Sequence, residues 1–299
     1  MFDWNDIRVF LTVARAGSTL GAARALDMNQ TTVSRRIQAL ERCLDLTLFS
    51  RDTRGFHLTE EGEMLLGASE GMENAAADLG AEADRLRRAL GGKIRITAAE
   101  DILNYSISEI VAEYRAKAPA TTFEYVAQDR FLDIEKGEAD VAFRAADHLD
   151  DATLLCRRVA DISWAVYCSR DYAQKHSAPS QADELLNHPV AAYEGKFAMS
   201  RASLWFMSQI AGRQVVMTSN TVVNMRAIVL SGVGLGLLPC FSSEPVPELV
   251  RCVVVPSENS PHIWMLTTSK AQRSRHLRSF TDFAAERFKT LRCRFELQE

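Results

Sequence analysis

The sequence predicts an α+β protein of several domains: a small helical unit with a two-stranded hairpin, one long helix, and a larger part in which strands and helices alternate. Three observations support this prediction. Two short amphipathic helices flank a turn near residue 28. Leucine or methionine recurs every seven residues between 65 and 86. From residue 93 onward, apolar runs alternate with amphipathic segments, which is typical of strands connected by helices.

The segment from Ser18 to Leu40 reads as two helices joined by a tight turn. Ser18 can cap the first helix, because its hydroxyl can accept from a free backbone N–H of the first turn, and Asn29 is expected to cap the second. In the second helix, Val33, Ile37 and Leu40 recur at helical spacing and predict one buried stripe.

The opposite face of that second helix is polar. Such side chains can donate to or accept from base edges in a DNA groove, and arginine can bind guanine through two hydrogen bonds. The expected DNA-binding residues on this helix are Gln30, Thr31, Thr32, Ser34, Arg35 and Gln38, with Arg36 and Arg42 at phosphates, which fix position rather than sequence. An ordinary amphipathic helix with a solvated face accounts for this segment alone equally well.

The next segment, residues 48–59, favours DNA binding. It is apolar, then basic and rich in turn residues, then apolar again. This pattern predicts a two-stranded wing with Arg54 at its tip, within reach of a minor groove or the phosphate backbone.

The first sixty residues resemble the winged helix-turn-helix of the LysR-type transcriptional regulators. The resemblance implies a sequence-specific regulator in which Gln30, Thr31, Ser34 and Arg35 face the major groove and Arg54 the minor groove. The matching positions are Phe10, Val13, Ala14, Gly17, Ser18, Ala22, Ala23, Leu26, Gln30, Val33, Ser34, Arg35, Ile37, Leu40, Glu41, Leu48, Phe49, Arg51, Leu58, Thr59 and Gly62.

A long helix is expected over residues 59–90, following a DNA-binding domain at 1–58. Thr59 is its expected cap, and at 1.5 Å per residue it would span about 48 Å. The seam residues are Leu65, Met72, Leu79 and Leu86. Their seven-residue spacing predicts a partner helix, and the resemblance implies dimerisation through it. A solvent-exposed connecting helix is the alternative. Gly91 and Gly92 read as a hinge.

Residues 93–299 are expected to form two α/β lobes, the first at 93–160 and 268–299 and the second at 161–267. The alternation predicts parallel sheets, with a short helix at 131–137 and a long extended stretch at 154–169. Residues 231–239 match the glycine-rich turn of the same family. The resemblance therefore implies a two-lobed effector domain that looks like a periplasmic binding protein.

Ligands of α/β sheets gather at the carboxyl ends of strands and at helix starts. The resemblance places a small-molecule effector between the lobes at such positions, and helix caps or solvated loops are the alternative for each residue. The expected effector-binding residues are Ala99, Glu100, Asp101, Gln128, Arg130, Phe143, Arg144, Tyr193, Asn220 and Thr221.

Two of these residues bear on the chemistry of the effector. Glu100 and Asp101 would oppose an anion unless Arg130 and Arg144 offset their charge. We therefore expect an effector that is not a simple monocarboxylate but is neutral, zwitterionic or cationic. The alternative is that both acids only complement the helix dipole.

The charge distribution and the sequence motifs bear on which other classes of protein the chain could belong to. The net charge is −4, yet residues 1–58 carry eight arginines against six carboxylates, so the positive balance lies in the expected DNA-binding domain. HExxH and P-loop motifs are absent from the sequence, so we expect no enzyme, cofactor or metal. A solute-binding protein, suggested by the two lobes, is disfavoured by the N-terminal DNA-binding unit.

The expected partners are double-stranded DNA, a small-molecule effector, further copies of the chain in a homodimer or homotetramer, and RNA polymerase. No apolar run is long enough to cross a membrane, and the start does not resemble a signal peptide, so we expect a cytoplasmic protein. The six cysteines contain no CxxC pair and read as thiols. Redox sensing is the less favoured alternative, with Cys156 and Cys168, or Cys240 and Cys252, as the closest pairs in sequence.

Overall fold

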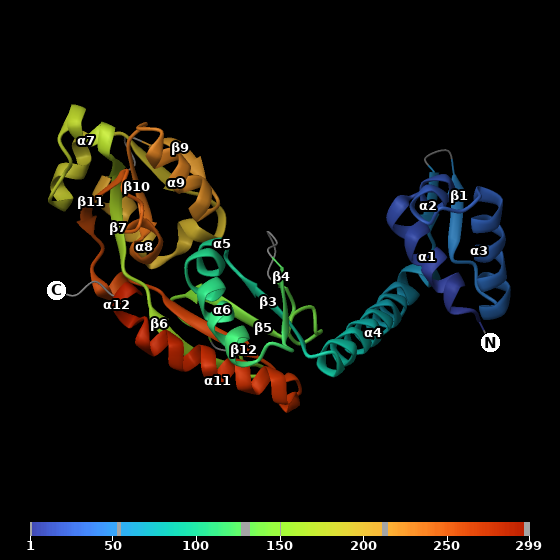
Figure 1. Cartoon of the computed structure of the whole chain (residues 1–299). Coiled ribbons are helices and arrows are strands. Elements are labelled where there is room, and N and C mark those ends of the chain that lie inside the picture. Colours follow the sequence, from blue (N-terminus) through green and yellow to red (C-terminus); the bar gives the residue numbers. More distant parts are fainter. Residues whose placement is uncertain (1, 53–54, 127–131, 150, 211–214, 296–299) are drawn as a thin grey trace. The chain divides into compact units, whose positions relative to one another are not determined.

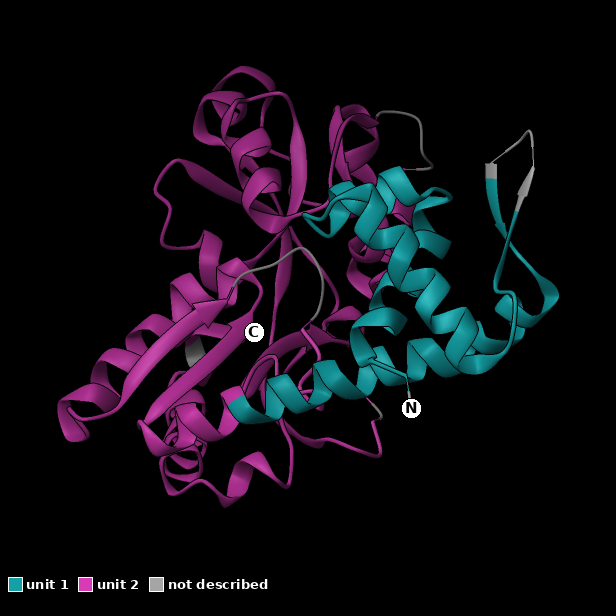
Figure 2. Ribbon diagram, turned by 90° about the vertical axis from the view of Figure 1, so that its right-hand side faces the viewer, with its two compact units in different colours: residues 1–83 teal, residues 84–299 magenta. Residues whose placement is uncertain are grey.

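The computed structural model describes residues 2–52, 55–126, 132–149, 151–210 and 215–295. The chain forms two compact units, Met1–Ala83 and Asp84–Glu299 (Figure 2). The boundary between them falls inside the long helix α4 (Glu60–Leu90). None of the helices in the described ranges is both long and apolar enough to cross a membrane.

The first unit contains three helices followed by a hairpin and the start of α4 (Figure 1). Its elements are α1 (Trp4–Ala16), α2 (Thr19–Ala25), α3 (Gln30–Leu44), β1 (Phe49–Asp52) and β2 (Gly55–Leu58). The strands are antiparallel, with Phe49 opposite Leu58 and Asp52 opposite Gly55. A winged helix-turn-helix is therefore present, and its wing tip, with Arg54, lies outside the described residues.

The core of this unit lies between α1, α2 and α3. The stripe Val33, Ile37 and Leu40 is buried, as its helical spacing predicts. Ala22 and Ala23 are also buried in the same core, where their small side chains let the helices pack closely.

The two expected helix caps have different outcomes. Ser18 Oγ accepts from the backbone N–H of Gly21 (3.0 Å), which confirms it as the cap of α2. Asn29 precedes α3 as expected, but its side chain makes no capping hydrogen bond, so that part of the prediction is wrong. Asn29, Gln30 and Thr31 are exposed, so water can satisfy the free N–H groups of this first turn.

The start of α4 is fixed to the helix-turn-helix at two points. Thr59 Oγ1 accepts from the N–H of Gly62 (3.1 Å), which confirms Thr59 as the cap, and the same hydroxyl donates to the carbonyl of Thr47 after α3 (2.6 Å). Arg15 on α1 forms a two-pronged pair with Glu73, from Nη1 to Oε1 (3.1 Å) and from Nη2 to Oε2 (2.7 Å). The Arg15 guanidinium accordingly lowers the pKa of Glu73.

The expected seam of α4 is largely exposed. Leu65 packs against the helix-turn-helix core, whereas Leu79 is 73% exposed and Leu86 49% exposed, and Met72 is also exposed. Apolar side chains that recur every seven residues on an exposed helix face are typical of a helix whose partner is another helix.

The first lobe of the second unit is built on a five-stranded sheet with the order β4-β3-β5-β12-β6. Helix α11 lies along this lobe (Figure 1). The strands are β3 (Lys93–Ala98), β4 (Thr122–Val126), β5 (Val141–Ala146), β6 (Leu155–Asp161) and β12 (His262–Thr267). The helices are α5 (Glu100–Ile102), a π-helical turn η1 (Leu103–Ile107), α6 (Ser108–Lys117), a 3₁₀ turn η5 (Ala271–Arg273), α11 (Arg275–Thr290) and α12 (Arg292–Phe295).

The second lobe has a five-stranded sheet with the order β11-β7-β10-β8-β9. The strands are β7 (Trp164–Ser169), β8 (Val190–Tyr193), β9 (Val215–Ser219), β10 (Leu235–Pro239) and β11 (Leu249–Val254). The helices are α7 (Arg170–His176), α8 (Arg201–Ile210), α9 (Val222–Leu230), α10 (Cys240–Ser243) and the 3₁₀ turns η2 (Ala182–Asn187), η3 (Gly195–Met199) and η4 (Ser257–Asn259).

The chain crosses between the lobes twice, after β6 and after β11. The two crossings are hydrogen-bonded side by side: Ile162 N–H donates to the carbonyl of Pro261, and Val255 N–H to the carbonyl of Trp164 (both 2.9 Å). Because each crossing brings a strand back in the opposite direction, β12 and β7 pair antiparallel with their neighbours. Each sheet is therefore mixed, and the prediction of parallel sheets is wrong in this respect.

The crossings also correct a lobe boundary. Residues 262–267 were expected in the second lobe, but β12 pairs with β5 and β6 of the first. Local sequence does not reveal this, since an apolar strand fits either sheet.

Three further local expectations differ from the structure. The expected helix at 131–137 is a turn over the described residues, closed by Gly137 N–H to the carbonyl of Ile134, with Gly137 at φ +74°. The glycine-rich stretch at 231–239 is a turn only at its start, because β10 is a buried central strand. The expected hinge at Gly91 and Gly92 follows a helical turn that is fixed to the first lobe.

The last helical turns of α4, before Gly91, contain Arg88. Its Nε and Nη2 bind the two carboxylate oxygens of Asp140 (both 3.1 Å), and Nη2 also donates to the carbonyl of Gly137 (2.8 Å). Both side chains are buried. This pairing holds the end of α4 to the first lobe, so free bending at 91–92 is not supported.

Two glycines of α4 offer a matched test of packing. A Cβ on Gly62 would lie 2.3 Å from the carbonyl oxygen of Leu48, whereas a Cβ on Gly67 would meet nothing within 4 Å. We expect Gly62→Ala to destabilise the first unit by about 1–3 kcal/mol through overpacking. Gly67→Ala should instead stabilise the helix by up to about 1 kcal/mol. Native-state hydrogen exchange of α3 amides measures both, and equal effects would contradict the packing at Gly62.

Candidate DNA-binding surface and effector site

The exposed face of α3 carries the polar residues expected to bind DNA. Gln30, Thr31, Arg35 and Gln38 are exposed, and Thr32 and Ser34 are half-buried. Thr31, Arg35 and Gln38 lie opposite the buried stripe, Thr32 and Ser34 lie at its sides, and Gln30 lies at the helix start in line with it. The amide of Gln30 donates to Thr19 Oγ1 (3.0 Å), which orients it beside the start of α2. The helix therefore presents donors and acceptors of the kinds that recognise base edges.

Arg36 differs from its expected role at phosphates. Its Nη1 donates to Asp6 Oδ1 (2.8 Å) and lies 3.6 Å from Asp3 Oδ2. The guanidinium is thus neutralised within the unit, where it holds α3 to α1. Arg42, in the last turn of α3, is exposed and is better placed for a phosphate.

A buried ionic cluster joins the two lobes of the second unit. Arg226, on α9 of the second lobe, donates through Nη2 to Asp101 Oδ2 of the first lobe (2.6 Å) and to Ser242 Oγ (2.7 Å). The Ser242 hydroxyl donates to the same Asp101 oxygen (2.5 Å). The side chains of Asp101 and Arg226 are 4% and 10% exposed. Low solvent access makes this contact stronger than a surface pair.

Aromatic rings surround this cluster. The guanidinium of Arg226 lies over the ring of Tyr105, 5.1 Å from its centroid, as in cation–π pairs. Tyr193, at the carboxyl end of β8, is buried against Trp164 with ring centroids 6.1 Å apart. Burial raises the pKa of the Tyr193 hydroxyl well above its usual value, and the nearby charge of Asp101 raises it further.

Several buried polar atoms at the cluster have no hydrogen-bond partner among the described residues. They are Asp101 Oδ1, Arg226 Nε and the Tyr193 hydroxyl. Asp101 Oδ1 accepts hydrogen bonds, Arg226 Nε donates, and the Tyr193 hydroxyl can do both. Leaving such atoms unpaired costs about 1–3 kcal/mol each, so this inter-lobe cluster is a site suited to a polar ligand group.

The other expected effector residues are spread more widely. Ala99 and Glu100 are exposed at the start of α5. Thr221 caps α9, its hydroxyl accepting from Asn224 N–H (3.2 Å), and Asn220 is exposed beside it. Gln128 and Arg130 lie outside the described residues.

Phe143 and Arg144 do not face one site together. Successive side chains of a strand point to opposite faces, and Phe143 is buried in the core against Phe288, with ring centroids 5.7 Å apart. The expectation that Phe143 lines the effector site is therefore wrong. Arg144 donates to the carbonyl of Leu132 (2.8 Å), and burial lowers its pKa.

Sequence reasoning missed Arg226 and Ser242. The signal for Arg226 was available, because it occupies a position of the apolar stripe of α9 together with Val222, Met225 and Val229. A charged residue within a buried stripe needs a partner of opposite charge. Asp101 has its counter-charge in this arginine of the other lobe, Arg144 donates to the carbonyl of Leu132, and Arg130 lies outside the described residues.

Comparisons with known proteins agree with this architecture. The family model of the bacterial regulatory helix-turn-helix protein, lysR family, matches residues 4–63, and that of the LysR substrate binding domain matches residues 87–289. The chain belongs to the LysR family. It is a LysR-type transcriptional regulator with a helix-turn-helix DNA-binding domain and a substrate-binding domain, and effector binding is typical of this family.

Individual relatives of this LysR-type regulator are distant. An "HTH-type transcriptional regulator" of Xanthomonas campestris pv. campestris is 27% identical over 297 residues, covering 95% of this chain and 85% of the relative. The structure of CrgA, a LysR-type regulator from Neisseria meningitidis, has a TM-score of 0.56 at 23% identity, covering 96% and 99% of the two chains. Full-length CbnR in complex with its target DNA has a TM-score of 0.54 at 18% identity, covering 96% and 100%.

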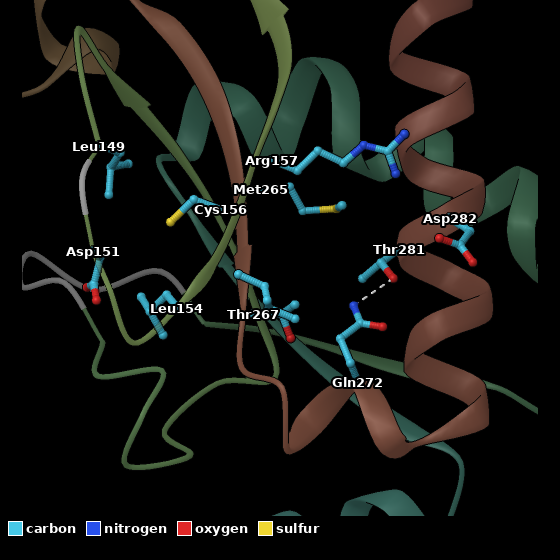
Figure 3. Close-up of a pocket in the computed structure, with 11 residues that line it drawn as sticks. Leu149, Asp151, Leu154, Cys156, Arg157, Met265, Thr267, Gln272, Thr281 and Asp282 are labelled. Carbon is cyan, nitrogen blue, oxygen red and sulfur yellow. Dashed lines mark hydrogen bonds between the residues drawn. The ribbon is translucent and has the colours of Figure 1, made fainter.

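The LysR substrate-binding domain also carries pockets away from the inter-lobe cluster. One, of about 480 Å³, lies in the first lobe between β6, β12 and α11, where Gln272 donates to Thr281 (2.9 Å) (Figure 3). None of the expected effector residues lines it. A second, of about 560 Å³, is open to solvent and includes Asn220 and Glu194. Among the described residues, no group of three His, Cys, Asp or Glu side chains is arranged to hold a metal ion.

Two cysteines of this regulator lie close together in space, although their spacing in the sequence does not predict it. Cys168 on β7 and Cys252 on the neighbouring strand β11 have sulfur atoms 3.6 Å apart, and Cys252 lies at a bulge of β11. The closest pairs in sequence, Cys156 with Cys168 and Cys240 with Cys252, are not the spatial pair. Cys240 is buried, and burial raises its pKa to about 11.

The inter-lobe cluster generates a stability prediction. Arg226→Met leaves the Asp101 carboxylate buried without its counter-charge, so we expect a loss of about 3–5 kcal/mol from the substrate-binding domain. As a control, Arg251→Met removes an exposed arginine paired with Glu244 (2.9 Å) and should cost less than about 1 kcal/mol. Hydrogen exchange of β8 and α9 amides measures the effect, and similar losses for both variants would contradict a buried pair.

Proposed function

We propose that this LysR-type regulator binds operator DNA as a dimer through the exposed face of α3, and that a small-molecule effector bound between the lobes controls it. The observation that carries the proposal is the polar face of α3, presented opposite a buried stripe in a winged helix-turn-helix. A face of this kind is suited to the major groove, whose width admits an α-helix.

Within that face, Arg35 and Gln30 are the proposed base readers, and Thr31, Thr32, Ser34 and Gln38 complete the surface. Arg35 is exposed at the centre of the helix. We assign it to guanine, because its planar group can bind both acceptors of that base. Arg54 of the wing remains a proposed contact in the minor groove. Arg36 is left out of this proposal because it is paired with Asp6.

Dimerisation is proposed through Met72, Leu79 and Leu86 of α4, with Leu65 at the edge of the seam. These side chains share one helix face and are exposed in the isolated chain. Covering them with a second copy would remove apolar area from water, which stabilises the pair by about 25 cal/mol per Å². Two DNA-binding units then read two half-sites of one operator. A homodimer is sufficient to cover this seam, and a homotetramer would need a further contact surface.

The effector is proposed to bind at the carboxyl ends of β3 and β8, where Asp101 and Tyr193 approach each other from the two lobes. Support comes from the unpaired buried atoms of Asp101, Arg226 and Tyr193 and from the tendency of ligands to bind at such strand ends. Ala99, Glu100, Asn220 and Thr221 flank this position at element starts. A ligand that satisfies atoms of both lobes favours one arrangement of the lobes over others.

One partner and one cellular location follow from the class of the proposed regulator. Control of transcription implies contact with RNA polymerase at the promoter, and work on genomic DNA implies the cytoplasm. Both stay proposals. A pull-down of RNA polymerase holoenzyme on operator DNA with and without the protein tests the first, and subcellular fractionation tests the second.

The DNA-binding assignment predicts different effects for two arginines of α3. Arg35→Ala should cost about 1–3 kcal/mol of operator binding and relax base preference at one position of each half-site. Arg42→Ala, as a phosphate-type control, should weaken binding evenly for all sequences and reduce the salt slope by about 1. Binding selections on randomised half-sites measure both. An even loss for Arg35→Ala would show that its role is assigned wrongly.

The seam on α4 predicts the oligomeric state. Leu79→Asp places a charge in the middle of the seam and should convert the dimer to a monomer in analytical ultracentrifugation. Ala77→Asp adds the same charge on the opposite, exposed face of α4 and should leave the mass unchanged. If Leu79→Asp kept the mass of a dimer, pairing through α4 would be excluded.

The whole proposal is tested by a footprint of the purified protein on the intergenic DNA beside its own gene, in excess random competitor DNA. Protection of a partly palindromic tract over several helical turns supports it. If neither this DNA nor a genome-wide selection in the presence of cell metabolites yields protected sites, the proposed operator binding is rejected.

A further inference from the structure

The inter-lobe cluster contains a carboxylate where an anionic ligand would otherwise bind. Asp101 Oδ2 accepts from Arg226 Nη2 (2.6 Å) and from the Ser242 hydroxyl (2.5 Å), and both donors belong to the second lobe. An arginine and a hydroxyl that converge on one oxygen are a typical arrangement for binding a carboxylate. Here the carboxylate belongs to the protein itself.

We propose that Asp101 acts as an internal anion that occupies this carboxylate site, and that it thereby determines the ligand specificity of the inter-lobe cluster. It excludes simple organic anions and admits ligands that bring a cationic or hydrogen-bond-donating group to the cluster. The inference rests on the proposed effector site, but its test uses neither DNA nor the natural effector.

Charge and burial support the exclusion of anions. Asp101 and Arg226 neutralise each other in a place with little solvent, so a second carboxylate beside them would be repelled by Asp101, and Arg226, the cation that pairs with Asp101 in the described part of the chain, is already engaged. To bind Arg226 Nη2, an entering anion would first have to displace a side chain that is tethered to the protein.

The unpaired buried atoms indicate which ligand groups the inter-lobe cluster can bind. Asp101 Oδ1 is buried and lacks a hydrogen-bond partner among the described residues, as does the Tyr193 hydroxyl nearby. The first of these atoms only accepts, and the second both donates and accepts. An ammonium, amide or hydroxyl group of a ligand would satisfy the carboxylate oxygen, whereas a carboxylate would not.

Position in the fold explains why one residue can control both lobes. Asp101 lies in the first turn after β3, directly before the π-helical turn η1 that carries Tyr105, and Arg226 is held against the ring of Tyr105. π-Helical turns often occur at functional sites. Asp101 and Arg226 are 125 positions apart in sequence, and their pairing links the helical segment after β3 to the middle of α9.

Chemical rescue tests the inference on the full-length protein. Asp101→Ala removes the carboxylate and leaves Arg226, Ser242 and a space of its size. We expect acetate and formate to bind this variant at least about tenfold more tightly than the wild-type chain in titration calorimetry, and to raise its melting temperature. Benzoate, which is much larger than the removed group, should rescue less than formate. The wild-type chain should bind none of the three at about 10 mM.

Two controls separate the cluster from general salt effects. Glu100→Ala removes the neighbouring, exposed carboxylate and should show no gain in acetate binding. The double variant Asp101→Ala with Arg226→Met should lose the gain, because it lacks the cation. If Asp101→Ala is unfolded in buffer that is poor in anions, its refolding on addition of acetate is the same readout, and Asp101→Ser provides a second variant.

The inference is overturned if neither Asp101 variant responds to acetate more than Glu100→Ala, if the double variant keeps the response, or if the wild-type chain binds acetate as tightly as Asp101→Ala. These outcomes are independent of operator binding. A wild-type protein that fails to protect DNA while Asp101→Ala binds acetate would reject the proposed function and leave the internal anion intact.

Discussion

The buried pair of Asp101 and Arg226 is the interaction on which the arrangement of the two lobes depends. Each lobe has its own sheet, and besides the chain crossings the lobes also meet where Phe241 packs against Phe295 (ring centroids 5.0 Å) and where Arg201 N–H donates to Asp147 Oδ2 (3.2 Å). Buried ion pairs contribute little net stability compared with apolar packing, but separating their partners is costly. The pair therefore favours one closed geometry more than it stabilises the fold, and Ser242 restricts that geometry further by bonding to both members.

The long helix α4 is fixed near each end by a different arginine. Near its start, Arg15 of α1 holds Glu73, and the absence of a Cβ at Gly62 lets the carbonyl of Leu48 approach. At its end, Arg88 is buried against Asp140 of the first lobe. The exposed seam lies between these points. A second copy packed on this seam would thus contact a helix whose two ends already belong to folded units.

Features with local periodicity were predictable from sequence, and features that depend on distant partners were not. The stripe of α3 and the caps at Ser18 and Thr59 follow from spacing and side-chain chemistry. The partner of Asp101 lies far along the chain on another lobe, so no local pattern specifies it, although Arg226 within an apolar stripe was a signal. The alternation of Phe143 and Arg144 along β5 shows that two neighbouring residues at one strand end do not share one site.

The paired crossings between the lobes have a mechanical consequence. Two chain segments bonded side by side, at Ile162 with Pro261 and at Val255 with Trp164, form a narrow ribbon rather than a single thread. A single segment permits rotation about every axis, whereas a two-segment ribbon bends easily across its flat face and resists torsion and in-plane bending. The ribbon therefore favours one relative movement of the lobes, the bending of its flat face. A ligand that binds between the lobes would act mainly by changing that bend angle.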